Sequence, residues 1–372
     1  MPALKRPEFH SLFLTRVRLL TSDSVGLTFH IPDNLLDNYR FVAGQYLTLQ
    51  AELQGEDVRR CYSIASAVQD GQKLEVGIKR VAGGVFSSYA CELSAGANMQ
   101  VMTPQGSFMA ETGGVHQYLV IAAGSGITPC LSIIKSVLAA EPESRIALVY
   151  GNRDSTSIMF ADDIKVLKDK YLERLSVVHI LSRESQDTEL LNGRIDADKL
   201  SRLHALGMLG TGSWDAAFCC GPQQMIDAVV PALQAIGIDE SNIKRELFVT
   251  GSAVEGSTAH QPTVAGYNAA DGASPAGEDT IQANVRIDGT EKQITLAGRE
   301  ETVLQAASRQ GVDLPFSCTG GMCCTCRCKL LEGEVTMDAN FSLADWEVEA
   351  GFVLACQARA GSDRLVLDFD AV

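Results

Sequence analysis

Four cysteines near the carboxyl end of the chain have the spacing of an iron–sulfur ligand set. Three stand in one short loop in the order C-x4-C-x2-C, and the fourth follows much later: Cys318, Cys323, Cys326 and Cys356. This is the plant-type spacing for a [2Fe–2S] cluster, which needs four thiolates around a compact core. Gly320 and Gly321 inside the loop should let the backbone curl so that amide N–H groups face the sulfurs.

A zinc site is the competing interpretation of these thiols. Zinc sites usually combine two C-x2-C units, and here only Cys323 and Cys326 form one, so the iron–sulfur interpretation is favoured. Cys324 and Cys328 fall outside the ligand spacing. They either support the cluster loop or fill space as small buried residues.

A second set of residues, R-C-Y-S at 60–63, ends one of the strand-like segments near the amino end. Strand alternation puts Arg60 and Tyr62 on one face, where a guanidinium can pair with a pyrophosphate and an aromatic ring can lie against a flavin. Ser63 faces the other way and can offer its hydroxyl or amide to a flavin ring nitrogen. Taken alone, the motif fits an ordinary strand with an exposed arginine and a packed tyrosine equally well.

A glycine-rich helix start follows at 83–88, with the sequence G-G-V-F-S-S. Gly84 and Ser87 at the beginning of that helix would form an anion site suited to a phosphate. Because this is the second phosphate-type element in one small domain, a flavin dinucleotide is the favoured ligand.

The segment G-S-G-I-T-P at 124–129 stands between an apolar strand-like run and an amphipathic helix. Gly124 and Gly126 permit close backbone approach, and the helix dipole favours a pyrophosphate at this point. Pro129 occupies the place of the third glycine in the G-x-G-x-x-G fingerprint, so the match is incomplete. Its position at the first crossover of an alternating β/α region supports a nucleotide site.

Three further positions follow strand-like segments in the same region. Cys220, in C-C-G-P, ends a late strand and could approach a nicotinamide ring, although a small buried cysteine is the commoner reason for such a residue. Arg153 and the pair Ser182-Arg183 each follow an earlier strand. The two arginines could bind a ribose 2′-phosphate, which would favour NADPH, or could be solvated surface residues.

Composition excludes several other functions. The 372 residues carry a formal net charge of −15, which argues against a nucleic-acid partner because phosphate backbones attract Lys and Arg. No apolar run approaches the ~20 residues that cross a bilayer, and residues 1–10 lack the apolar core of a signal peptide. With 11 cysteines and no export signal, we expect a reducing, cytoplasmic location and no membrane partner.

The apolar pattern divides the chain into three folded regions. Short alternating segments over the first ~110 residues predict an antiparallel β-barrel. From about residue 117, apolar strands alternate with helical stretches, which predicts a parallel sheet covered on both faces. A hairpin, a helix over 301–310, the cysteine loop and a strand over 327–335 come last. We therefore expect a barrel over 1–112, an α/β domain over 113–249, a flexible linker over 250–280 and a cysteine-bearing domain over 281–372.

Together, R-x-Y-S, G-S-G-I-T-P, C-G-P and the cysteine loop resemble the ferredoxin–NADP reductase superfamily. The domain order is similar to that of oxygenase reductases with a plant-type ferredoxin at the carboxyl end, most closely the reductase subunits of bacterial phenylacetyl-CoA epoxidases. This resemblance covers nearly the whole chain except the linker. It implies a multidomain fold: an FAD-binding antiparallel β-barrel, a nicotinamide nucleotide-binding α/β domain and a β-grasp [2Fe–2S] ferredoxin domain.

The resemblance also implies roles for single residues. FAD would be bound by Arg60, Tyr62, Ser63, Ile78, Lys79, Gly84 and Ser87, with Phe248 covering the flavin. The nicotinamide nucleotide, NADPH or else NADH, would be bound by Gly124, Gly126, Thr128, Arg153, Ser182, Arg183 and Cys220. Ser63 and Cys220 would be the catalytic residues, and the four spaced cysteines would be the metal ligands.

These parts predict an electron-transfer enzyme. A nicotinamide gives up two electrons as a hydride, a [2Fe–2S] cluster accepts one, and a flavin can do both. The expected acceptor is the di-iron oxygenase component that acts on phenylacetyl-CoA. The alternatives are a reductase for a Rieske dioxygenase or steroid hydroxylase, a redox sensor or passive electron carrier without nucleotide turnover, and a zinc-binding interaction module fused to a barrel.

Overall fold

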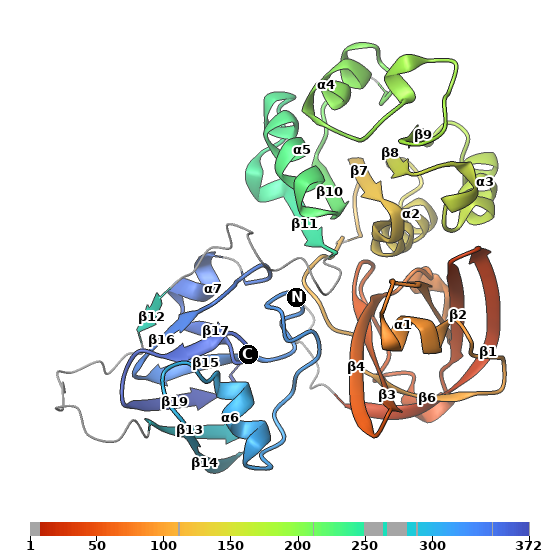
Figure 1. Ribbon diagram of the computed structural model, residues 1–372. Coiled ribbons are helices and arrows are strands. Elements are labelled where there is room, and N and C mark those ends of the chain that lie inside the picture. The colour runs from red at the N-terminus through yellow and green to blue at the C-terminus, as the bar shows by residue number, and fades with distance from the viewer. Residues whose placement is uncertain are drawn as a thin grey trace. The chain divides into compact units, whose positions relative to one another are not determined.

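The computed structural model describes residues 8–110, 112–210, 212–248, 263–265, 281–287, 289–343 and 345–371. These residues fall into two compact units, one ending at residue 248 and one beginning at residue 263, which are described separately (Figure 1). In the described part of the chain, no helix is long and apolar enough to cross a membrane.

The first unit begins with a six-stranded antiparallel barrel in the order β4-β3-β6-β1-β2-β5 (Figure 1, red to orange). A bridge between Ile64 and Val76 joins the end of β4 to β5 and so brings the two edges of the sheet together. The predicted antiparallel barrel is confirmed. Its strands are β1 (Phe9–Thr21), β2 (Ser24–His30), β3 (Tyr46–Leu53), β4 (Glu56–Ser63), β5 (Lys73–Lys79) and β6 (Asn98–Met102).

Alternation along the strands fills the barrel. Leu12 and Leu14 of β1 are fully buried, whereas their neighbours on the strand are exposed. Phe86, from the short helix α1 (Val85–Ala90), completes the same apolar cluster. Strand β6 escaped prediction because its five residues hold only three apolar side chains, too few to establish a period.

The α/β half of the first unit has a five-stranded parallel sheet in the order β11-β10-β7-β8-β9. The chain leaves β7 toward β8 on one side and later returns to β10 on the other, so the strand order reverses beside β7. The predicted parallel sheet is confirmed. The strands are β7 (Gln117–Ala123), β8 (Arg145–Asn152), β9 (Leu175–Leu181), β10 (Ala216–Gly221) and β11 (Ile243–Leu247).

Helices cover both faces of this sheet because its strands are apolar on both sides. Val120 and Ala122 of β7 belong to the cluster under α2 (Ile127–Ala140) and α3 (Ala161–Lys170). Their neighbours Leu119 and Ile121 belong to the cluster under α4 (Ala197–Ala205) and α5 (Gln223–Ala235).

The second unit is built on a five-stranded mixed sheet in the order β14-β13-β19-β15-β17, with a small sheet β12-β16-β18. Thr302 and Gln305 form a capping box that starts α6 (Val303–Arg309). The strands are β12 (Thr263–Ala265), β13 (Ile281–Ile287), β14 (Thr290–Leu296), β15 (Arg327–Glu332), β16 (Glu334–Met337), β17 (Phe352–Leu354), β18 (Ala358–Ala360) and β19 (Arg364–Asp368), and a further helix is α7 (Asp345–Glu349).

Two expectations for this unit differ from the structure. The single strand expected over 327–335 is two strands, because Gly333 takes a φ of +94° and a Cβ there would lie 2.2 Å from the carbonyl oxygen of Arg364. The linker predicted over 250–280 contains β12, whose Val264 pairs with Val335 of β16. Three residues are too few for a periodic signal, so the strand could not be distinguished from the Gly-, Ala-, Ser- and Pro-rich sequence around it. The other residues of the predicted linker lie outside the described ranges.

Candidate functional site

The nucleotide-type loop lies where the order of the parallel strands reverses. Gly124–Gly126 form a single 3-10 turn between β7 and α2, and the hydroxyl of Thr128 donates to the carbonyl oxygen of Ser125 at 2.9 Å. A Cβ on Gly126 would stand 2.3 Å from the carbonyl oxygen of Cys220. The glycine therefore brings the start of α2 against the carboxyl end of β10, the edge at which open α/β sheets bind ligands.

The predicted catalytic residues Ser63 and Cys220 meet through a residue that the sequence reasoning missed. The Ser63 hydroxyl donates to Oε2 of Glu246 at 3.2 Å, and the Cys220 thiol approaches the same oxygen at 3.8 Å. Glu246 lies opposite Cys220 in the parallel register of β10 and β11. The sequence did contain a signal for Glu246, because it is a carboxylate near the end of the last predicted strand, as Cys220 is near the end of the strand before it.

The Glu246 carboxyl is enclosed by protein even though the residue as a whole is only part-buried. Burial raises its pKa from the usual 4.5 to about 7, against the lowering effect of the hydrogen bonds from Ser63 and Cys220. Burial also raises the pKa of the Cys220 thiol well above its usual value, so this thiol is neutral near pH 7. The site thus places one carboxyl that titrates near neutrality between a hydroxyl and a thiol.

The predicted flavin-binding residues of the barrel lie around β4 and α1. Arg60 is exposed, and the half-buried Tyr62 ring lies 5.8 Å from the Phe86 ring of α1. Gly84 precedes α1, where a Cβ would approach the Ser87 hydroxyl at 2.6 Å. The glycine leaves room for the Ser87 hydroxyl at the start of α1, and the Arg60 guanidinium is exposed, which are groups that fit the phosphates of a flavin nucleotide.

Two other predicted flavin contacts differ in accessibility. Ile78 is fully buried in the barrel core, so only its backbone can face a ligand. Phe248 is part-buried, and its backbone N–H donates to the carbonyl oxygen of Gly221 at 3.2 Å, beside Cys220.

The predicted phosphate-binding arginines lie next to each other at the carboxyl ends of β8 and β9. The backbone N–H of Arg183 donates to the carbonyl oxygen of Arg153 at 2.7 Å. Arg153 also pairs with Asp23 of the barrel at 2.9 Å, and Lys79 lies 3.8 Å from the same carboxylate. Ser182 and Arg183 are exposed. These two cations at one strand edge fit a phosphate group, with Arg153 already tied to the barrel.

The four spaced cysteines of the second unit interact in two pairs. The thiol of Cys318 hydrogen-bonds with that of Cys323, and Cys326 does so with Cys356, which raises the pKa of Cys318 and Cys326 and lowers that of Cys356. Within the described ranges, no three or more His, Cys, Asp or Glu side chains are already grouped so that they could hold a metal ion. Two thiol pairs are the donor set that a binuclear cluster requires, two ligands for each iron, and so they fit it.

Backbone N–H groups of the cysteine loop point at the sulfurs, as predicted. Gly320 and Met322 each donate to Cys318 Sγ at 3.4 Å. Gly321 has a φ of +75°, and a Cβ there would stand 2.8 Å from the carbonyl oxygen of Ala339, whereas Gly320 has no such constraint. Gln357, which the sequence reasoning did not single out, donates to Cys356 Sγ at 3.5 Å.

Comparison with protein families divides the chain into the same three kinds of domain. Residues 11–109 match the oxidoreductase FAD-binding domain, and residues 120–230 match the oxidoreductase NAD-binding domain. Residues 285–361 match the 2Fe-2S iron-sulfur cluster binding domain and contain all four spaced cysteines.

Curated relatives match nearly the full chain. It is 44% identical over 369 residues to a subunit of the 1,2-phenylacetyl-CoA epoxidase of Escherichia coli (strain K12), covering 98% of each chain. It is 34% identical to the ferredoxin reductase component of 3-ketosteroid-9-alpha-monooxygenase of Rhodococcus rhodochrous, covering 94% of this chain and 93% of the relative. Among solved structures, phthalate dioxygenase reductase has a TM-score of 0.58 at 21% identity over 97% of this chain and 98% of its own, which supports the fold.

Proposed function

Because this chain belongs to the family of oxygenase reductases that combine FAD-binding, NAD-binding and [2Fe–2S] domains, we propose that it supplies electrons to a phenylacetyl-CoA epoxidase. The donor is NADPH, or else NADH, and the acceptor is the di-iron oxygenase component. The observation that carries this proposal is the 44% identity to the Escherichia coli epoxidase protein over 98% of both chains.

FAD, when bound, would supply the conversion between a two-electron hydride and single electrons. The residues of the chain have to bind the cofactors, orient them and exclude water. Gly126 and Thr128 hold the nucleotide at the carboxyl edge of the sheet, and Arg153, Ser182 and Arg183 bind the 2′-phosphate. Arg60, Tyr62, Lys79, Gly84 and Ser87 hold FAD, with the backbone of Ile78 beside them and Phe248 covering the flavin.

Ser63, Cys220 and Glu246 lie beside the place where the flavin and nicotinamide rings would meet. The hydrogen bond from Ser63 Oγ to Glu246 Oε2 holds a proton on the serine oxygen and fixes the direction of that hydroxyl. Cys220 presents a neutral thiol at the end of β10. Cys318, Cys323, Cys326 and Cys356 would hold the cluster as its four thiolate ligands.

A second candidate acceptor is the oxygenase component of a steroid hydroxylase. It is favoured by the 34% identity to the 3-ketosteroid-9-alpha-monooxygenase reductase component. The two candidates share one electron route and differ only in the protein that receives the electrons.

The test is anaerobic addition of NADPH to the purified protein, followed by each purified oxygenase component. We expect a flavin and iron–sulfur spectrum that bleaches with NADPH, and faster NADPH oxidation with the phenylacetyl-CoA epoxidase component than with a steroid hydroxylase or Rieske component. A preparation that contains zinc without iron, or a flavin that NADPH leaves oxidised, would refute the proposal. Preference for the steroid component would support the second candidate.

We place the protein in the cytoplasm. None of the 11 cysteines forms a disulfide, which suits a reducing compartment.

A further inference from the structure

The barrel and the α/β half of the first unit are joined by an ion pair that includes none of the predicted cofactor residues. We propose that Arg18 is a positioning residue: by holding Glu75 of the barrel and Asp163 of α3 together, it sets the angle of the α/β half on the barrel and hence the geometry of hydride transfer. The inference rests on the proposed function and concerns a residue that would touch neither flavin nor nucleotide.

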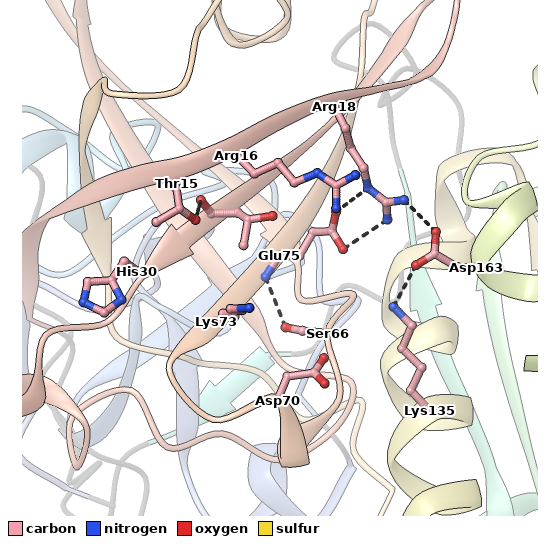
Figure 2. Close-up of a pocket in the computed structure, with 11 residues that line it drawn as sticks. Thr15, Arg16, Arg18, His30, Ser66, Asp70, Lys73, Glu75, Lys135 and Asp163 are labelled. Atoms are coloured by element: carbon pink, nitrogen blue, oxygen red, sulfur yellow. Dashed lines mark hydrogen bonds and ion pairs between the residues drawn. The ribbon is translucent and has the colours of Figure 1, made fainter. Parts of the chain in front are cut away.

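Arg18 is bound on both sides (Figure 2). Its Nε lies 2.7 Å from Oε1 of Glu75, its Nη2 lies 3.2 Å from the other oxygen of that carboxylate, and its Nη1 lies 2.8 Å from Oδ2 of Asp163. Side-chain exposure is 21% for Arg18, 13% for Glu75 and 17% for Asp163. An arginine that forms a two-bond fork and is shielded from solvent holds a more definite geometry than an exposed ion pair does.

A buried aromatic ring supports the same junction. Phe160, directly before α3, has a φ of +57° and is 1% exposed. The Arg18 guanidinium lies 5.2 Å from the centroid of its ring. On the barrel side, a Cβ on Gly77 would stand 2.6 Å from Phe160 Cε2, so the ring lies directly on the backbone of β5. A bulky residue held at positive φ indicates that its surroundings fix its conformation.

Strand β5 connects this junction to the predicted site. Glu75 accepts from Arg18, and Gly77 contacts both Phe160 and the methyl group of Thr128, for which a Cβ on Gly77 would be 2.8 Å away. Lys79, a predicted flavin contact, is the next outward residue on the same strand. Alternate residues of a strand are ~7 Å apart, so Glu75, which holds α3 through Arg18, is close to Gly77, which contacts the start of α2. A shift of α3 on the barrel would therefore also displace the start of α2.

The other contacts between the two halves explain why Arg18 matters for the angle. Along α2, Ser132 Oγ donates to the carbonyl oxygen of Ser66 at 2.7 Å, and Ser136 Oγ accepts from the backbone N–H of Val68 at 3.0 Å. Away from α2, Arg153 pairs with Asp23 of the barrel at 2.9 Å, and the Ser63 hydroxyl donates to Glu246 of β11 at 3.2 Å. Asp163 lies on α3, which none of these hydrogen bonds reaches, so the Arg18–Asp163 pair fixes a further part of the α/β half against the barrel.

Lys135, also drawn in Figure 2, provides a matched control variant, Lys135→Gln. Lys135 of α2 pairs with Asp163 at 3.2 Å and is 15% exposed, but both residues belong to the α/β half. The pair lines the same cleft, of about 550 Å³, as Arg18 and Glu75. Lys135→Gln therefore removes a cation from the same carboxylate without cutting a bond between the halves.

The experiment uses the full-length protein with its cofactors. Anaerobic stopped-flow at saturating NADPH measures the rate of flavin reduction. The long-wavelength charge-transfer absorbance reports stacking of nicotinamide on flavin. Hydrogen exchange reports opening of β5 and α3. For Arg18→Gln and Asp163→Asn we expect flavin reduction slowed about 10- to 100-fold, because a misplacement of about 1 Å costs that much. We also expect a weaker charge-transfer band, faster exchange in β5 and α3, and an unchanged dissociation constant for NADPH.

Lys135→Gln should reduce its flavin at close to the wild-type rate, and Arg18→Lys should recover part of the loss in Arg18→Gln. Asp163→Asn keeps the Arg18–Glu75 fork, so it provides the test if Arg18→Gln fails to fold. Equal rates in Asp163→Asn and wild type, or an equal loss in Lys135→Gln, would overturn the inference. A wild-type flavin that NADPH does not reduce would instead refute the proposed function.

Discussion

The Ser63 hydroxyl lies 3.2 Å from the Glu246 carboxylate, although 183 positions separate the two residues in the chain. Ser63 ends the fourth strand of the barrel, and Glu246 lies on the last strand of the parallel sheet. The contact therefore exists only when the two halves of the first unit are joined. It also brings a carboxyl with a pKa of about 7 to the place where we propose that nicotinamide and flavin meet.

The first prediction concerns Glu246→Gln and stability. Because the folded-state pKa of about 7 lies above the usual 4.5, folding favours the protonated carboxyl. This contribution is complete below pH 4.5 and is lost as the pH rises through 7. A glutamine does not ionise, so the variant should be more stable than wild type by up to about 3 kcal/mol at pH 8 and nearly equal to it at pH 4.5. Urea unfolding at both pH values measures this difference, and a pH-independent difference would contradict the pKa assignment.

A second prediction compares two glycines of the nucleotide-type loop. Gly126→Ala would place a Cβ 2.3 Å from the backbone of Cys220, which must separate α2 from β10. We expect the free energy of unfolding to fall by about 1–3 kcal/mol and NADP+ binding to weaken clearly. Gly124→Ala faces open space at a φ of +54°, so only backbone strain of about 1 kcal/mol applies. Thermal unfolding and NADP+ titration of both variants measure the contrast. Equal nucleotide affinity in the two would show that the approach to Cys220 is not required.

The third prediction separates the adjacent glycines of the cysteine loop. Gly321→Ala combines a φ of +75° with a Cβ 2.8 Å from the carbonyl oxygen of Ala339, so the loop must move away from that residue. We expect iron content to fall by at least half and the cluster absorbance with it. Gly320→Ala meets no atom closer than 3.5 Å and should keep its iron. Iron analysis of freshly purified proteins measures both, and iron loss from the Gly320 variant alone would contradict the structure.

A fourth prediction addresses the choice of nucleotide. Arg183 is exposed at the end of β9, and its backbone is fixed to Arg153. If it binds the 2′-phosphate, Arg183→Ala removes a charged hydrogen bond of about 1.5–3 kcal/mol. The KM for NADPH should rise about 10- to 100-fold, while the KM for NADH, which lacks that phosphate, stays unchanged. Steady-state kinetics with both nucleotides measure the two KM values. An equal rise in KM for NADPH and NADH would assign Arg183 a structural role.

The residue pattern alone predicted the three kinds of domain, which the family comparisons confirm, and four cluster ligands, which stay a prediction. Alternation in β1 and β2, continuous apolar runs in β7 and β8, and the C-x4-C-x2-C spacing are local signals. They can be read locally because side-chain period, strand burial and ligand spacing are properties of short segments. The same locality explains what was missed: β6 and β12 are too short or too polar to establish a period, and the turn at Gly333 depends on a neighbouring strand.

The contact of Ser63 with Glu246, the Arg18–Asp163 pair and the position of Phe160 could not be predicted from the chain. Each depends on the contact of two domains, and residues 145 or 183 positions apart leave no periodic trace in a single sequence. The pairing of four cysteines into two sets likewise required the folded loop. Sequence thus determined which cofactor chemistry this protein can host, because ligand types and spacings are local. Tertiary structure decided where the titrating carboxyl of Glu246 lies, how the two halves of the first unit are joined, and which cysteines pair. These features depend on distances between residues that are far apart in the chain.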